Sequence, residues 1–272
     1  MSDVGFRNLL KVLVRSRSLR FTADMVRQSP ISSLARLRWS GHDIVYRSGT
    51  ADPFVLNQIL LKRGRKAEYY LPRGLDPKIV LDIGSNIGAS IIYFHRQFPK
   101  ARILGFEPHP DSFRVLQENV AQLPGVTVFN YGVGAAQQRI AARADAVNFG
   151  AFNTRGQFKD RGYPANTVEC EVRRLDDVLR ELGIAQVDLI KIDCEGAEAD
   201  VFSTLPDEIL KNCQWIVGEF HDHAGFEVLA RLAPHFHLDL KKKMFRDRFR
   251  FHACNISKLR ELSRSDLDAL QR

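Results

Sequence analysis

The sequence has few cysteines and no long hydrophobic run, and these absences exclude several classes of protein. Its four cysteines, among 272 residues, are widely spaced and form no CxxC pair. This argues against a zinc ribbon or a disulfide scaffold and suits a reducing cytoplasm. No stretch approaches the ~20 apolar residues of a membrane-spanning helix, and the N-terminus has no apolar core followed by a cleavage site. We therefore expect a cytoplasmic globular protein without a signal peptide.

The charge of the chain is unevenly distributed. Its formal net charge is +8, yet residues 1–50 alone contain nine Lys and Arg residues against three Asp. A second basic run covers residues 241–250. Basic segments of this kind can bind anionic lipids, nucleic acids or acidic substrates. The plainer explanation of the excess positive charge is a pair of solvated helices and a charged strand edge. No nucleic-acid-binding motif accompanies the charge, so we do not expect nucleic acid as a partner. Weak association of the basic N-terminal segment with a membrane surface stays open as the alternative to solvated helices.

Two organisations follow one another along the chain. Residues 6–19 and 29–39 have apolar residues at roughly helical spacing, and a polar stretch, 40–53, follows them. We therefore divide the chain into a basic helical extension, 1–50, and a main domain, 51–272. In the main domain short apolar runs alternate with helical segments, which is typical of a parallel α/β sheet covered on both faces. The predicted strands lie at 78–84, 101–107, 126–132, 187–193 and 214–220, and a closing antiparallel hairpin at 236–244 and 248–256. The helices are predicted to begin near Gly88, Asp111, Leu175, Ala197 and Gly225.

Residues 147–166 interrupt this pattern. The segment is rich in Gly and Asn, has little periodicity and contains four aromatic residues. Long irregular loops inside compact domains are uncommon unless they are functional. We interpret this segment as a lid that faces the substrate, with an ordinary surface excursion as the alternative.

The first chemical signal is IVLDIGSNIGAS, residues 79–90. The pattern predicts an apolar strand that ends at Asp82, a turn that contains Gly84 and Gly88, and then a helix. Glycine lets the backbone of such a turn approach a ligand, and the N-terminus of the helix supplies free amides. The dinucleotide fingerprint Gly-x-Gly-x-x-Gly is absent. Asn86 stands where a further glycine is common, and Asn tolerates left-handed backbone angles.

The second signal is RILGFEPHP, residues 102–110. It predicts a strand that ends at Glu107 and is stopped by Pro108 and Pro110. An acidic residue at the end of the second strand of such a unit accepts hydrogen bonds from ribose hydroxyls. The two signals together indicate a cofactor that contains a nucleoside.

The third signal is VDLIKIDCEGAE, residues 187–198. With the period of a strand, Lys191, Asp193 and Glu195 lie on one side. Three charged residues at the end of a central strand are unfavourable unless they are paired or functional. Glu198 falls in the first turn of the next helix, where the helix dipole also favours an acid, so both a structural and a functional role stay open for it.

Together these three motifs, with DPFVLNQIL and EYYLP upstream, resemble the FkbM-type family of S-adenosylmethionine-dependent methyltransferases. The resemblance covers roughly residues 51–257 and leaves the first 50 outside it. It implies a class I, Rossmann-like doubly wound sheet and S-adenosylmethionine as cofactor. The residues implied to bind that cofactor are Asp82, Gly84, Ser85, Asn86, Gly88, Glu107, Pro108 and Asp193.

The resemblance implies an enzyme that methylates a hydroxyl of a sugar, glycolipid, polyketide or related metabolite. The alternative is a non-catalytic or nicotinamide-binding Rossmann-like module. Methylating an alcohol requires a base near the donor methyl group. We expect His221 as that base because histidine is largely neutral at pH 7. The other residues that we assign to catalysis are Asp193, Glu195, Glu219 and Lys191.

A metal ion is not expected. Asp193, Glu219 and His221 are residues of types that ligate Mg²⁺ or a similar ion, but the family resemblance does not demand one. The acceptor and the oligomeric state are not determined at this level.

Overall fold

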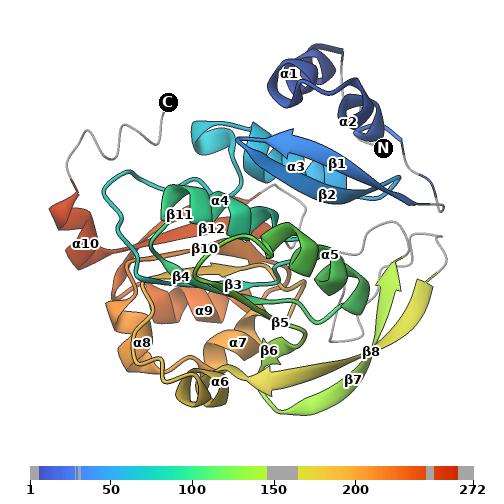
Figure 1. The fold of residues 1–272 in the computed structure, drawn as a ribbon. Helices are drawn as coiled ribbons and strands as arrows, with labels where there is room; N and C mark the ends of the chain where they lie inside the picture. The colour runs from blue at the N-terminus through green and yellow to red at the C-terminus, as the bar shows by residue number, and fades with distance from the viewer. Residues whose placement is uncertain (1–5, 28, 30–31, 146–164, 243–247, 263–272) are drawn as a thin grey trace.

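A seven-stranded sheet forms the centre of the protein, in the order β11-β12-β10-β9-β3-β4-β5 (Figure 1). The computed structural model describes residues 6–27, 29, 32–145, 165–242 and 248–262. The strands of this sheet are β3 (Ile79–Ile83), β4 (Arg102–Phe106), β5 (Val126–Phe129), β9 (Leu189–Ile192), β10 (Trp215–Phe220), β11 (Phe236–Lys242) and β12 (Phe249–Asn255).

The pairing of these strands confirms the predicted fold class. Strands β5, β4, β3, β9 and β10 are parallel, whereas β12 is antiparallel to β10 and β11 is antiparallel to β12. The result is a mostly parallel class I sheet with a C-terminal antiparallel hairpin. The predicted turn of that hairpin, around Asp247, lies outside the described residues. Since β3, β4, β9 and β10 are parallel neighbours, their carboxyl ends share one edge of the sheet.

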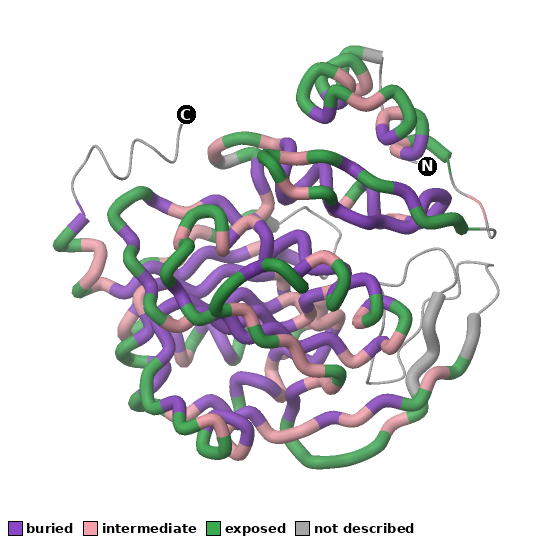
Figure 2. Tube along the Cα trace, in the orientation of Figure 1, coloured by how far each residue is buried: buried purple, intermediate pink, exposed green. Residues whose placement is uncertain are grey.

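Helices cover both faces of the sheet, and strand periodicity supplies the apolar side chains that they pack on. Val80 is buried with α4 and α5 on one face, and its neighbour Leu81 is buried with α6 to α9 on the other. Buried residues accordingly follow the central strands (Figure 2). The helices are α4 (Ala89–Gln97), α5 (Pro110–Val120), α6 (Leu175–Glu181), α7 (Glu198–Thr204), α8 (Asp207–Asn212), α9 (Gly225–Leu232) and α10 (Ile256–Glu261). No helix of the described ranges is long and apolar enough to cross a bilayer.

The N-terminal extension is helical only in its first half, which corrects the prediction of a second helix at 29–39. After α1 (Phe6–Ser16) and α2 (Leu19–Asp24) the chain forms an antiparallel hairpin of β1 (Ser33–Trp39) and β2 (His42–Ser48). In β1, buried Ala35 and Leu37 alternate with exposed residues. This is the period of a strand, which the helical interpretation missed.

The hairpin packs against the main domain and does not stand apart from it (Figure 1). Asn119 of α5 donates to the carbonyl of Val45, and its side-chain oxygen accepts from the Val45 amide at 2.7 Å. The segment between the hairpin and the sheet forms α3 (Asp52–Leu56), a π turn η1 (Asn57–Leu61) and a 3₁₀ turn η2 (Gly64–Lys66). The stretch 40–53, interpreted as a polar separator, therefore contains a buried strand.

A second small sheet, which the sequence analysis did not predict, has the order β6-β8-β7. Its strands are β6 (Gly132–Gly134), β7 (Gln138–Asp145) and β8 (Ala165–Arg174). Of the proposed lid, residues 147–164 lie outside the described residues, and the last two begin β8.

Candidate active site

The loop between β3 and α4 contains three residues in the left-handed region. Gly84, Asn86 and Gly88 have φ angles of 79°, 47° and 87°. Glycine and asparagine are the residues that adopt this conformation most readily. A Cβ at Gly84 would lie 1.9 Å from the carbonyl oxygen of Asp193. The loop therefore needs glycine there to lie directly against the end of β9.

A buried ion pair between Lys191 and Asp82 supports this loop. The Lys191 ammonium lies 3.2 Å from Asp82 Oδ1 and donates to the carbonyls of Ile83, at 3.1 Å, and Gly84, at 2.5 Å. Ser90 donates to the other oxygen of Asp82. Burial opposes the charge of Lys191, but the nearby Asp82 carboxylate raises the lysine pKa overall. The buried Lys191 ammonium thus holds the loop through the two carbonyls, and the fully buried Asp82 pairs with it.

Glu107, at the end of β4, joins the two predicted cofactor segments. Its Oε2 accepts from the Asn86 amide at 2.7 Å, and its Oε1 accepts from the His109 amide at 2.8 Å. Burial raises the pKa of Glu107 to about 7, although these amides and the charges of Lys191 and Arg47 act in the opposite direction. The carboxylate keeps lone pairs for further donors, because each oxygen accepts more than one hydrogen bond.

Ser85 and Pro108 have supporting positions beside Glu107. The Ser85 hydroxyl is buried and donates to the Asp82 carbonyl at 2.9 Å. The carbonyls of Glu107 and Pro108 accept from the Asn130 side chain at 2.9 and 3.2 Å. These contacts shape the backbone around the loop.

Arg47 of β2 connects the N-terminal hairpin to the loop between β3 and α4, a link that the sequence analysis did not detect. Its buried guanidinium pairs with Asp52, with Nε 2.8 Å from Oδ2. It also donates to the side chain of Asn86 at 3.4 Å and to Ser112 at 3.3 Å. The hairpin therefore contacts the loop from a segment that lies outside the family resemblance.

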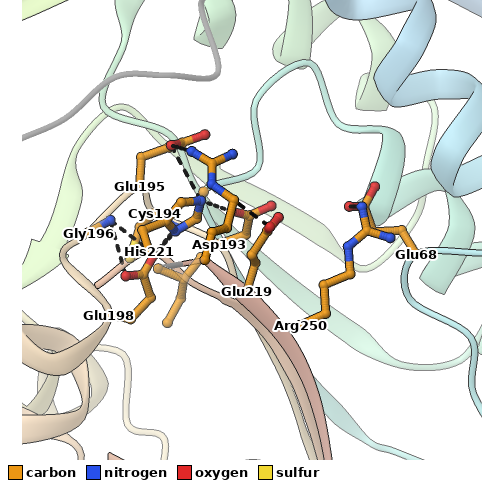
Figure 3. Close-up of polar contacts among 12 residues, drawn as sticks. Glu68, Asp193, Cys194, Glu195, Gly196, Glu198, Glu219, His221 and Arg250 are labelled. Carbon is orange, nitrogen blue, oxygen red and sulfur yellow. Dashed lines mark hydrogen bonds and ion pairs between the residues drawn. The ribbon is translucent and has the colours of Figure 1, made fainter. Parts of the chain in front are cut away.

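The second half of the site is a cluster of carboxylates around His221, at the carboxyl ends of β9 and β10 (Figure 3). His221 Nε2 lies 3.3 Å from Glu195 Oε2 and 3.7 Å from Asp193 Oδ1. Asp193, Glu219 and His221 each offer a ligand-type atom, and these atoms lie within 4.8 Å of one another. The ends of β9 and β10 therefore converge on one cluster.

Glu198 orients His221, which assigns the acid whose role the sequence left open. Its carboxylate bonds to His221 Nδ1 at 2.8 Å and accepts from the amides of Cys194 and Gly196 at 3.1 Å. These amides belong to a tight turn in which Glu195 has a φ of 53° and Gly196 of 108°. The turn aims the Glu195 side chain into the cluster and holds the imidazole through Glu198.

The carboxylates determine the charge of His221. Burial lowers its pKa, but the hydrogen bond with Glu198 and the charges of Glu195, Glu198 and Asp193 raise it to about 9. The expectation that His221 is neutral at pH 7 is therefore wrong for this arrangement. Burial raises the pKa of Glu195 and of Glu219 to about 7.

Tyr69 and two arginines complete the cluster, and motif spacing did not identify them as site residues. The Tyr69 hydroxyl donates to Asp193 Oδ2 at 2.7 Å. Arg248 Nη2 lies 3.0 Å from Glu195 Oε2 and its Nε lies 3.9 Å from Glu219, while Arg250 pairs with Glu68 at 2.5 Å. Tyr69 belongs to EYYLP, one of the segments that carry the family resemblance, so that segment was the available signal.

Comparison with protein families gives one match that covers most of the sheet. The sequence model of the methyltransferase FkbM domain matches residues 82–251. This range contains the loop between β3 and α4, Glu107 and most of the cluster around His221, but neither Tyr69 nor the N-terminal hairpin.

Curated relatives include proteins from three bacteria. The AMB antimetabolite synthetase AmbE of Pseudomonas aeruginosa is 33% identical over 177 residues, 53% of this chain and 8% of that protein. The 31-O-demethyl-FK506 methyltransferase FkbM of Streptomyces tacrolimicus is 28% identical over 61% of this chain and 76% of its own length. The 2-O-methyltransferase NoeI of Sinorhizobium fredii is 30% identical over 56% of this chain and 66% of its own length. The match thus spans a small part of the synthetase and about two thirds or more of the other two proteins.

Proposed function

The chain belongs to the FkbM methyltransferase family, and we propose that it transfers the methyl group of S-adenosylmethionine to a hydroxyl of a sugar, glycolipid, polyketide or related metabolite. The names of FkbM and NoeI describe methylation of oxygen in those two proteins, which supports oxygen as the atom methylated here. One observation carries the proposal. The glycine-containing loop after β3 lies directly against the half-buried acid cluster at the end of β9, through the close contact of Gly84 with Asp193.

The cofactor would lie along the loop between β3 and α4. Glu107 would accept hydrogen bonds from the two ribose hydroxyls, and the half-buried Gly84 and Asn86 would line the methionine part. The sulfonium supplies an already activated methyl group, so the chain has to align donor and acceptor.

Glu195 is the base that this geometry favours. The carboxylates around His221 raise its pKa to about 9, which disfavours the neutral imidazole that a base needs at neutral pH. The pKa of Asp193 is lowered, because the charges of Lys191 and His221 outweigh the effect of burial, which makes Asp193 a weak base. Glu195 has a pKa of about 7, which matches the operating pH of a general base. An acceptor hydroxyl that attacks the methyl group would have to lose its proton, and the Glu195 carboxylate would accept it.

Calorimetric titration of the full chain tests the cofactor assignment. S-adenosylhomocysteine should bind in a saturable way and raise the melting temperature, and NADH and NADPH should do neither. The reverse pattern, or no binding of any of these nucleotides, would exclude the proposal. Incubation of a metabolite or glycan extract with deuterated-methyl S-adenosylmethionine should then place the label in a methyl ether, and a label on nitrogen or carbon would exclude O-methylation.

A further inference from the structure

The cluster around His221 contains a set of side chains suited to a metal ion. Asp193 follows β9, Glu219 lies near the end of β10 and His221 follows it directly. Their nearest ligand atoms lie within 4.8 Å of one another. Two ligands of one ion that are each ~2.1 Å from it are at most roughly 4 Å apart. The three atoms are therefore slightly farther apart than the ligands of one ion, and small side-chain rotations would close the difference.

His221 provides an independent indication of a ligand. Its side chain is only 7% exposed, and its Nε2 is buried without a hydrogen-bond partner among the described residues. The carboxylate oxygens of Glu195 and Asp193 lie 3.3 and 3.7 Å from Nε2, but neither contact has hydrogen-bond geometry. The hydrogen-bonding capacity of this buried ring nitrogen is therefore unused within the described residues, which is uncommon for a buried polar atom.

The opposite ring nitrogen has the partner that metal-binding histidines use. Nδ1 lies 2.8 Å from Glu198 Oε1, and Glu198 is itself held by two backbone amides of the turn before α7. A carboxylate on one ring nitrogen fixes the tautomer in which the other nitrogen has a lone pair for the metal. The backbone of the turn therefore sets the direction in which Nε2 points.

From these contacts we propose that Asp193, Glu219 and His221 bind a divalent transition-metal ion through Nε2 and two carboxylates. Imidazole favours ions such as Zn²⁺ and Fe²⁺ and carboxylate suits Mn²⁺, whereas Mg²⁺ is usually held by oxygen ligands alone. Arg248 supplies positive charge beside Glu195 and Glu219 when no ion is bound, and its side chain, 40% exposed, has room to withdraw. The ion replaces the proton on Nε2, so His221 binds the ion as a neutral imidazole.

The role of the ion rests on the proposed function, although its binding does not. An acceptor hydroxyl that coordinates a divalent ion has a lowered pKa. Glu195, beside the ion and outside the ligand set, would then receive its proton. The ion also fixes the acceptor oxygen next to the loop that would hold the cofactor.

Titration of the full chain with Mn²⁺, followed by the electron paramagnetic resonance signal of the free ion, tests the proposal. We expect one saturable site. Asp193→Asn and Glu219→Gln should each weaken Mn²⁺ binding at least tenfold, and Glu198→Gln should weaken it by about 10- to 100-fold, as is typical of partners behind a ligand. Glu208→Gln, in an exposed acid of α8, is the matched control and should bind Mn²⁺ like the parent chain. Circular dichroism identifies any variant that fails to fold, and the remaining variants still decide the result.

The same samples distinguish the two proposals. If S-adenosylhomocysteine binds but Mn²⁺ does not saturate a site, or if Glu219→Gln and Asp193→Asn bind it normally, the metal site is refuted and the proposed function stands. If Mn²⁺ binds as expected but S-adenosylhomocysteine does not, the metal site stands and the proposed function fails.

Discussion

Glu107 is the residue on which cofactor binding should depend most. Each ribose hydroxyl would donate a charge-assisted hydrogen bond worth roughly 1.5–3 kcal/mol. Glu107→Ala should therefore weaken S-adenosylhomocysteine binding at least tenfold in calorimetry while the fold persists. Glu118→Gln, in an exposed acid of α5, is the control and should bind normally. Unchanged affinity of the Glu107 variant would refute the ribose assignment.

The pKa of Glu107 predicts that cofactor affinity depends on pH. The group is ionised above about pH 7 and accepts from both hydroxyls, whereas protonation below that pH removes an acceptor. Affinity should therefore decline by up to about tenfold per pH unit below 7. Because this pKa lies above the ordinary 4.5, the contribution of Glu107 to the free energy of unfolding is largest below 4.5 and is lost as the pH rises through 7. Titration of Glu107→Gln with S-adenosylhomocysteine should give an affinity that does not change with pH. If the affinity of that variant falls with pH as steeply as that of the parent chain, the pH dependence belongs to another group.

Glu195 should affect turnover and not cofactor binding. Removing a general base typically slows the chemical step by ~10²–10⁴-fold. Glu195→Gln should therefore lower kcat by at least 10²-fold and leave the affinity for S-adenosylhomocysteine unchanged, as measured by calorimetry and by steady-state kinetics on the identified acceptor. Near-normal turnover in this variant would move the role of base to Glu219, whose pKa burial also raises to about 7.

At the scale of elements, the contact between β9 and β10 depends on Gly218. A Cβ at this position would lie 1.9 Å from the backbone carbonyl oxygen of Ile192, which no side-chain rotation relieves. Gly218→Ala should therefore reduce the free energy of unfolding by about 3 kcal/mol or more, as measured by urea denaturation. Gly183→Ala is the comparison, because its φ is 65° but nothing lies within 4 Å. It should lose only ~1 kcal/mol through backbone strain, and equal losses in the two variants would show that the clash is relieved.

At the scale of the whole molecule, Arg47 connects the N-terminal hairpin to the sheet. Removing one partner of a buried ion pair typically destabilises a protein by about 3–5 kcal/mol, because the other charge stays buried. Arg47→Met should therefore lower the free energy of unfolding by that amount, measured by urea denaturation, and should weaken S-adenosylhomocysteine binding through Asn86. Arg36→Met removes an exposed pair from the same hairpin and should change stability by less than about 1 kcal/mol. A similar small effect of both variants would show that the hairpin does not support the cofactor loop.

The sequence by itself determined the parallel sheet and the positions of its functional ends. Short apolar runs, the glycines of the first loop and the prolines after Glu107 are local signals, and they located β3, β4, β9 and β10 correctly. The hairpin at residues 33–48 was missed in part because the short apolar pattern around Leu34 and Leu37 fits a helix as well as a strand. The two faces of the hairpin differ in exposure because the rest of the protein covers one of them, and the sequence alone does not show this.

Only the tertiary structure decided the chemistry of the second half of the site. Glu198 and His221 are 23 positions apart in the chain, and Tyr69 and Asp193 are 124 apart, so no local pattern pairs them. The pKa of His221 depends on three carboxylates, of which Glu198 is buried and Glu195 and Asp193 are half-buried. The contact with Asn86 depends on Arg47 from the N-terminal hairpin. Charges and hydrogen bonds act through space, and their strength depends on burial and on distances that the order of residues does not specify.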